Sequence, residues 1–204
     1  MRKSLLFVWA CMGLVCLMSA CKTSVKSKEW KLVWVEDFDQ KNSFDESVWT
    51  KIPRGTSDWN NYMSYYDSCY AMQDGNLILR GIANHTQKND TAPYLTGGVY
   101  TKGKKLFTGG RVEVCARLQA AKGAWPAIWM LPEKAEWPKG GEIDIMERLN
   151  HDRIAYQTTH SYYTHILGIK DNPPHGGINK INPEEYNIYS VDIYPDSLVF
   201  AVNH

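Results

Sequence analysis

The chain has 204 residues, enough for one domain with a sizeable core, and it carries 23 basic against 22 acidic side chains. This near-neutral balance, without a basic stripe, argues against nucleic acid as a partner. Aromatic residues make up 12% of the chain and include 8 Trp and 12 Tyr. The composition fits a ligand that is polar but uncharged overall, with flat faces on which indole rings can stack.

The first twenty residues read as an export signal. Arg2 and Lys3 give a positive start, and the apolar run 5–17 is too short to span a membrane and remain there. Small residues then precede Cys21, a pattern that resembles the lipobox of bacterial lipoproteins, in which the cysteine becomes the lipid-bearing first residue. We therefore expect residues 1–20 to be removed and the protein to be exported and anchored to the bacterial cell envelope. The alternative is a plain secretory signal with an unrelated cysteine.

A short polar tether, residues 21–29, would follow the lipid and lead into one domain over residues 30–204. Some surface-displayed lipoproteins carry an acidic run after the lipidated cysteine, whereas this chain places Lys22, Lys26 and Lys28 there. The sequence therefore leaves open whether the anchor lies on the periplasmic or the outer face. The lipid would be the only attachment to a membrane.

Two cysteines, Cys69 and Cys115, remain inside the domain once the signal is removed. Export permits a disulfide between them, but two cysteines alone cannot show one. Cys115 falls on the polar side of the alternating stretch 111–117, together with Glu113 and Arg117. A free thiol and a bridge both remain open.

The domain reads as β structure. Runs of apolar and β-branched residues recur between turn signals such as 74–76 (DGN), and no long amphipathic helical pattern competes with them. Short strands at this spacing predict an all-β sandwich. The predicted strands are 31–35, 77–80, 98–101, 111–118, 127–131, 142–147, 155–161, 189–194 and 198–202.

The stretch 140–148 reads GGEIDIMER and sets three carboxylates among apolar side chains. In a helix, at about 100° per residue, Glu142 and Asp144 would point about 200° apart. In a strand these two share a face, about 6.6 Å apart along the chain, and Glu147 falls on the opposite face. A single β-bulge adds one residue without advancing the pairing, and this returns Glu147 to the face of the other two acids. We therefore predict a bulged strand over 142–147.

This spacing predicts the geometry of a retaining glycosidase. Glu147 would lie about 13 Å along the strand from Glu142, and inward-leaning side chains would leave about 5–6 Å between the carboxyl groups. Retaining enzymes separate their two carboxyl groups by roughly 5–5.5 Å and inverting enzymes by roughly 6.5–9.5 Å. Three such close acids cannot all ionise cheaply, so Asp144 is placed to share a proton with Glu142.

The stretch GEIDIMER resembles the E-x-D-x-x-E signature of glycoside hydrolase family 16, in the bulged form of its laminarinase-like members. The resemblance covers about residues 30–204 and implies a concanavalin A-like jelly-roll β-sandwich with a concave sugar-binding face. It also implies endo-acting, retaining hydrolysis of a β-linked glycan, with Glu142 as nucleophile, Asp144 as its partner and Glu147 as general acid/base. Further segments that resemble the family, in its order, are 30–38, 74–79, 109–113, 125–132 and 194–198.

Two features depart from the family's usual pattern. Tyr62 stands where laminarinase-like members place a Glu, and the segment 149–152 (LNHD) looks closer to relatives that cut β-galactosides in host O-glycans. The substrate linkage therefore stays open between a β-1,3/1,4-glucan and a β-galactoside. Family members usually continue beyond the segment that 200–204 resembles, so we expect a domain cut short at its C-terminus.

Five side chains are candidates for binding sugar. Trp125 and Trp129 are four residues apart and can share one face of a strand, where indole rings would stack on pyranose rings. Trp137 lies in the loop before the acids, and His160 lies on the strand expected to pair with theirs. Asn61 could hydrogen-bond sugar hydroxyls. A purely structural role, in the core, on the surface or in a turn, is the alternative for each.

No set of side chains makes a convincing metal site, so we expect no cofactor. Family members often hold a structural calcium away from the cleft, and Glu36 would lie near it, with the other ligands in strands expected after residue 204. We expect a monomer whose partner is a β-linked polysaccharide or an O-glycan. A lectin-like sandwich without catalysis is one alternative. A transglycosylase, in which a sugar hydroxyl intercepts the covalent intermediate, is another.

Overall fold

The computed structural model describes residues 30–40, 42–119, 121–172 and 174–204. The expected signal peptide, the tether and Cys21 lie outside these residues. The chain divides into two units, Met1–Lys31 and Leu32–His204, and all of the described strands belong to the second unit.

The described residues form short antiparallel strands and contain no α-helix. The strands are β1 (Thr50–Lys51), β2 (Tyr70–Gln73), β3 (Asn76–Leu79), β4 (Gly81–Ala83), β5 (Tyr94–Thr96), β6 (Val99–Tyr100), β7 (Gly110–Ala116), β8 (Ala127–Met130), β9 (Glu142–Glu147), β10 (Ile154–His160), β11 (Gly176–Lys180), β12 (Asn187–Ile193) and β13 (Leu198–Val202). Two short helical segments interrupt them, the 3-10 turn η1 (Asp67–Cys69) and the π-type turn η2 (Tyr162–Ile166). Within the described part of the chain, no helix has the length and hydropathy needed to cross a membrane.

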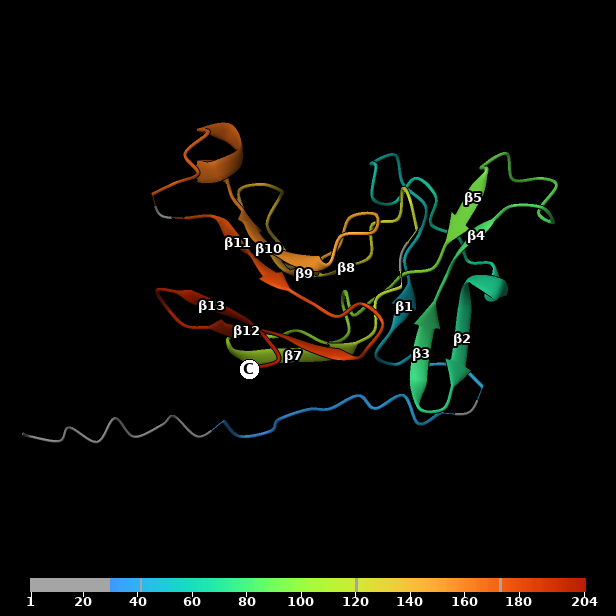
Figure 1. Ribbon diagram of the computed structural model, residues 1–204, viewed down its shortest axis with the longest axis horizontal. Coiled ribbons are helices and arrows are strands. Elements are labelled where there is room, and N and C mark those ends of the chain that lie inside the picture. The colour runs from blue at the N-terminus through green and yellow to red at the C-terminus, as the bar shows by residue number, and fades with distance from the viewer. Residues whose placement is uncertain (1–29, 41, 120, 173) are drawn as a thin grey trace, which may run out of the picture. The chain divides into compact units, whose positions relative to one another are not determined.

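Two sheets make the body of this unit. One has the strand order β11-β10-β9-β8, the other has the order β13-β12-β7, and the first lies over the second (Figure 1). Two-stranded ribbons, β1-β6, β2-β3 and β4-β5, complete the described strands. The packed sheets confirm the predicted all-β sandwich.

Apolar side chains from both sheets meet in one core. Burying each such side chain contributes about 1.5–3 kcal/mol. In β7 the pattern alternates, so that Val112, Val114 and Ala116 turn inwards while Glu113 and Cys115 are exposed, as predicted. The buried members of the core are Leu118, Ile145, Met146, Ala155, Ile181, Tyr189 and Val191.

All of the predicted strands from 77–80 onwards are confirmed. They correspond, in chain order, to β3, β6, β7, β8, β9, β10, β12 and β13. The prediction of a strand over 31–35 is wrong. Residues 32–35 pair with no strand among the described residues, and Leu32, Val33 and Val35 are exposed. Alternation alone does not make a strand, because the backbone groups also need a hydrogen-bonded neighbour.

Five strands were missed, namely β1, β2, β4, β5 and β11. The clearest case is β11, which reads GGINK and has every residue exposed. Its extended form comes from pairing with β10 and not from an apolar pattern of its own. Both Cys69, which is buried, and Cys115 are free thiols, which settles the question of a bridge.

The sheets open at one side. Among the described strands, β11 and β13 are edges, and a cavity of about 820 Å³ lies between them, lined by residues that include Gln157, His175 and Phe200. The expectation of a domain cut short at its C-terminus stays a prediction.

Candidate active site

The strand β9 contains the predicted β-bulge. From Asp144 to Glu147 this strand advances three residues, whereas its neighbour β10 advances only two, from Thr158 to Tyr156. A matching shift in register occurs on the other side, against β8. One extra residue therefore sits in β9, as the spacing of the acids required.

The bulge separates the apolar and acidic side chains of β9. Two consecutive residues, Ile145 and Met146, both belong to the core between the sheets. Glu147 can therefore return to the face that carries Glu142 and Asp144, and both glutamates act electrostatically on the aspartate. The structure thus brings the three predicted acids together.

A buried glutamine supports the bulge. Gln157 on β10 is 2% exposed, and its Nε2 donates to the carbonyl of Ile145 at 3.0 Å. Its Oε1 accepts from Asn179 Nδ2 at 2.6 Å. A bulge leaves ladder groups without their regular partners, and this side chain satisfies one of them. Gln157 is not among the predicted site residues. A polar residue two positions from Ala155, on the core face of a strand, was a usable signal for it.

Asp144 is the buried member of the acid cluster, with 2% of its surface exposed. Burial, reinforced by repulsion from Glu147 and Glu142, raises the pKa of Asp144 to about 8. Its Oδ2 is buried and has no hydrogen-bond partner among the described residues, although His160 Nε2 lies 3.3 Å away. At neutral pH Asp144 is therefore mostly protonated.

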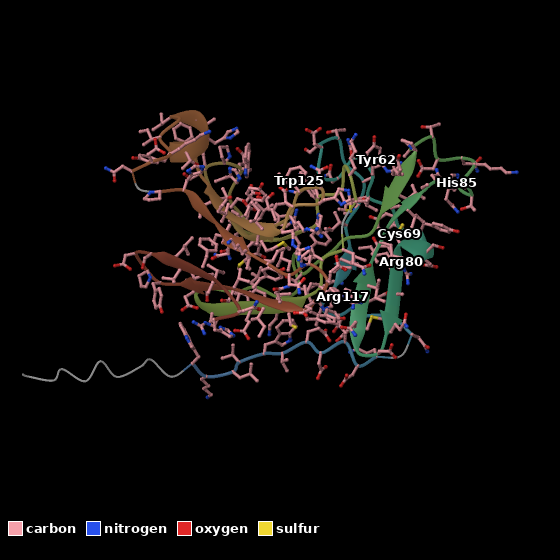
Figure 2. All side chains as sticks on the ribbon, in the orientation of Figure 1. Tyr62, Cys69, Arg80, His85, Arg117 and Trp125 are labelled. Atoms are coloured by element: carbon pink, nitrogen blue, oxygen red, sulfur yellow. The ribbon has the colours of Figure 1, made fainter. Side chains whose placement is uncertain are left out.

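Two indole groups hold the outer acids. Trp125 Nε1 donates to Glu147 Oε1 at 2.8 Å, and Trp137 Nε1 donates to Glu142 Oε2 at 2.5 Å. Each indole N–H group fixes one carboxyl oxygen and so orients the acid that carries it. Both tryptophans remain 48% exposed, and Trp125 lies on the side of the sheet that faces away from β7 and β12 (Figure 2).

The loop before β9 presents Trp137. Gly140 has no room for a side chain, since an added Cβ would lie 2.5 Å from Pro132 Cγ, and Gly141 has a φ of +81°. Glycine alone fits both conditions readily. The Trp137 ring then packs edge-on against His165 of η2, with 4.4 Å between ring centroids. The two loops at this end of the acid cluster therefore touch each other.

The remaining predicted site residues divide into two groups. Trp129 pairs with Asp144 across β8 and β9, and its ring meets Trp59 edge-on at 4.9 Å. His160 pairs with Glu142 across β10 and β9. Both therefore lie beside the acids.

Asn61 makes no contact with the acids among the interactions of the described residues. Its backbone N–H donates to Ser57 O at 2.9 Å, which fits the turn alternative. Its side-chain oxygen is buried without a partner in the described part of the chain. Trp59, in the same loop, is the residue that reaches the cluster through Trp129.

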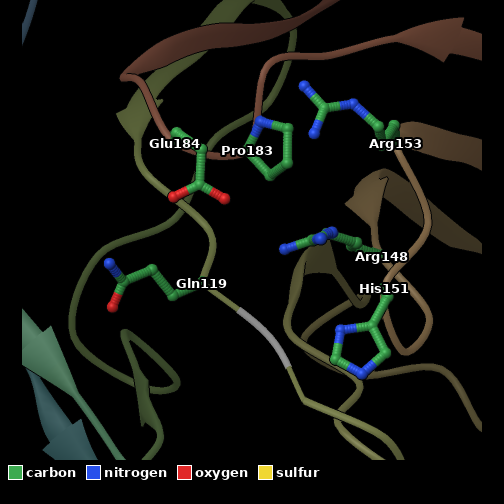
Figure 3. A pocket seen from close by; sticks show the side chains of 6 residues that line it. All are labelled: Gln119, Arg148, His151, Arg153, Pro183 and Glu184. Atoms are coloured by element: carbon green, nitrogen blue, oxygen red, sulfur yellow. The ribbon is translucent and has the colours of Figure 1, made fainter.

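A separate pocket of about 480 Å³ lies past the end of β9 (Figure 3). Arg148, which is 4% exposed, donates from Nε to Asp152 O at 2.6 Å and from Nη1 to Leu118 O. These bonds connect the chain that leaves β9 to the segment at Leu118. None of the predicted site residues lines this pocket, which is formed by Gln119, Arg148, His151, Arg153, Pro183 and Glu184.

The residue considered for a structural calcium, Glu36, already accepts two hydrogen bonds. Phe38 N donates to its Oε1 and Trp49 Nε1 donates to its Oε2, each at 3.0 Å. The expectation of no cofactor stays a prediction.

Comparison with known proteins gives consistent matches. The model of the XgeA-like, catalytic GH16 domain matches residues 67–182. The keratan-sulfate endo-1,4-beta-galactosidase of Sphingobacterium multivorum is 37% identical over 187 residues, which are 89% of this chain but 43% of that protein. The beta-glucanase of Rhodothermus marinus is 30% identical over 200 residues, which are 92% of this chain and 68% of that protein. The chain thus spans less than half of the first of these relatives.

Solved structures show the same fold. The laminarinase catalytic domain from Thermotoga maritima has a TM-score of 0.73 and 28% identity, over 86% of this chain and 75% of that one. The laminarinase from Rhodothermus marinus has a TM-score of 0.74 and 29% identity, over 86% of this chain and 72% of that one. These likenesses confirm the expected jelly-roll β-sandwich.

Replacing Gln157 by leucine tests its support of the bulge. The change should lower the free energy of unfolding by about 1–3 kcal/mol, because Ile145 O and the Asn179 amide lose a buried partner. Urea denaturation measures this, with the exposed Gln73→Leu as control, for which we expect a change within about 0.5 kcal/mol. Equal stability of Gln157→Leu and Gln73→Leu would contradict the assignment.

The raised pKa of Asp144 predicts a pH dependence of stability. The folded protein keeps a proton that the unfolded chain loses above its ordinary pKa of 3.8, so stability should fall as pH rises from about 4 through 8. Asp144→Asn should flatten this fall, because the amide stays neutral. Unfolding free energies at a series of pH values measure it, with the exposed Asp67→Asn as control. A fall as steep in Asp144→Asn as in the wild type would refute the prediction.

Proposed function

Because the chain belongs to glycoside hydrolase family 16, we propose that the protein is a retaining endo-β-glycosidase that hydrolyses O-glycosidic bonds in a β-linked glycan. The observation that carries the proposal is the bulge in β9, which places the buried Asp144 beside Glu142 and Glu147; burial and these two acids raise its pKa. Burying three neighbouring acids destabilises the folded state through desolvation and mutual repulsion, so a purely structural sheet would not be expected to contain them.

The roles follow from the environment of each acid. Glu142 attacks the anomeric carbon and forms a covalent glycosyl-enzyme intermediate, while Glu147 protonates the leaving oxygen. Glu147 then acts as a base on the water that releases the sugar. Asp144 keeps its proton because its pKa is raised, and it shares this proton with Glu142 through a hydrogen bond. Glu142 therefore stays available as the nucleophile.

The aromatic side chains supply the sugar-binding surface. Trp125, Trp129 and Trp137 surround the acids and can stack on pyranose faces, and the indole N–H groups of two of them already orient the acids. His160 and Asn61 offer polar groups for sugar hydroxyls. A sugar hydroxyl that donates to Asn61 Oδ1 would satisfy this oxygen, which has no partner among the described residues.

We propose a β-galactoside as the first linkage class to test. The relative at 37% identity is named a keratan-sulfate endo-1,4-beta-galactosidase, and Tyr62 departs from the laminarinase-like pattern. A β-1,3/1,4-glucan is the other class, since the other relatives named above are a beta-glucanase and laminarinases.

A substrate panel tests the function. The full chain is incubated with keratan sulfate, mucin O-glycans, agarose-type galactan, laminarin and mixed-linkage glucan, and the products are sized. Endo-hydrolysis gives a series of oligosaccharides from one class of substrate. If none of the five substrates is cleaved, the proposal is contradicted. Transglycosylation would instead give longer products at high acceptor concentration.

Binding without hydrolysis is a second candidate. A beta-1,3-glucan-binding protein of Penaeus monodon is 32% identical over 120 residues, which are 57% of this chain. Retention on immobilised glycan without any product from the panel would favour this candidate. The presence of all three acids in one coupled cluster favours hydrolysis.

The two glutamates should respond differently to substitution. Glu142→Gln should lose hydrolysis by several orders of magnitude and keep glycan binding, because it removes the nucleophile. Glu147→Ala should also lose most turnover but recover part of it with azide, giving a β-configured azide product, because azide needs no general base. Product configuration by NMR measures this. Turnover by Glu142→Gln at the wild-type rate would remove the assignment.

We also propose the envelope anchor at Cys21, on the sequence pattern alone. Expressed in a bacterium that processes lipoproteins, the wild type should incorporate labelled palmitate and sediment with membranes. Cys21→Ser should do neither, whereas Cys115→Ser, which removes an exposed thiol, should behave as the wild type. Label in Cys21→Ser would speak for a different attachment.

A further inference from the structure

Three donor atoms of different residues converge at the acid cluster. Glu142, Asp144 and His160 each offer one ligand atom, and these atoms all lie within 4.8 Å of one another. His160 Nε2 is 3.3 Å from Asp144 Oδ2. Zinc bonds to nitrogen and oxygen measure about 2.0–2.2 Å, so two ligands at a tetrahedral angle lie about 3.4 Å apart. One edge of such a site is therefore already formed.

A second observation points to a ligand at the same place. Of the three acids in this cluster, Asp144 is the one that is almost wholly buried. Its Oδ2 is buried and has no hydrogen-bond partner among the described residues. A buried acceptor without a hydrogen-bond partner destabilises the folded state. A cation between Asp144 Oδ2 and His160 Nε2 would satisfy it. His160 keeps 36% of its side chain exposed, which leaves the cation a route from solvent.

We propose that a divalent transition-metal ion, with Zn²⁺ as the representative, binds Glu142, Asp144 and His160 and inhibits the enzyme. The ion displaces the carboxyl proton of Asp144 to solvent, takes the neutral Nε2 of His160, and leaves its fourth position to water. Calcium and magnesium fit less well, because they prefer six or more oxygen ligands and avoid imidazole. The inhibitory consequence rests on the proposed function, since it requires Glu142 to be the nucleophile; the binding does not.

The choice between the two glutamates makes the ligand set testable. Glu142 still has a carboxylate oxygen outside its bond to Trp137, whereas Glu147 is not among the three converging ligands. Glu142→Gln and Glu147→Gln should both abolish turnover, but only the first should weaken zinc binding. Activity and metal affinity are thereby separated.

Isothermal titration of the full metal-free chain with zinc chloride measures the binding. We expect one high-affinity ion per wild-type chain and at least about tenfold weaker binding in His160→Gln and Glu142→Gln. Glu147→Gln should bind as the wild type does. The matched control is His85→Gln, which removes an exposed imidazole from the loop after β4, remote from Trp125 (Figure 2). Thermal melts without metal confirm that each variant is folded.

The outcomes separate the site from the function. Wild-type affinity in His160→Gln, or equal weakening in Glu147→Gln and Glu142→Gln, would overturn the site. Zinc binding as expected, without turnover of any glycan in the panel, would support the metal site and contradict the proposed function. Where turnover is found, added zinc should inhibit it and a chelator should restore it, and full turnover of the zinc-loaded chain would refute the inhibitory role.

Discussion

One extra residue in one strand is the constraint on which the candidate site depends. Without the bulge, Glu147 would face the core, where a carboxylate would be unpaired and desolvated. With it, the core gains both Ile145 and Met146, and the acid cluster gains its third member. The ladder groups that the bulge disturbs would weaken the sheet, and the buried Gln157 offsets part of that cost through Ile145 O.

The bulge also brings three acids close enough to repel one another, and protonation of Asp144 reduces this repulsion. Three carboxyl groups on one face repel one another, and the central one is the most buried. Protonation of Asp144 removes one charge where water is most excluded, and the outer two acids keep the indole donors of Trp125 and Trp137. Burial and two acidic neighbours therefore raise the pKa of the central carboxyl group, that of Asp144.

The rest of the sandwich holds these groups in place. The second sheet supplies the apolar surface against which β9 packs, and β8 and β10 fix its register from either side. Loops that carry the tryptophans are fastened by tight backbone contacts, as at Gly140, and by the buried guanidinium of Arg148. The same open arrangement that would admit a sugar also leaves His160 accessible beside Asp144, which is why the cluster can be read as a cation site.

The amino-acid sequence by itself determined the β class, the strand that carries the three acids and the bulge in that strand. These are local properties: a period of two, the spacing of three acids, and apolar residues that must be buried together. Only the tertiary structure decided that 32–35 pairs with no strand among the described residues and that GGINK becomes β11. It also decided that Gln157 supports Ile145 O and that two indoles bind the outer acids. Those features depend on which distant segment of the chain packs beside each residue. The residues of a strand predict its alternation, but they do not identify the strands with which it pairs.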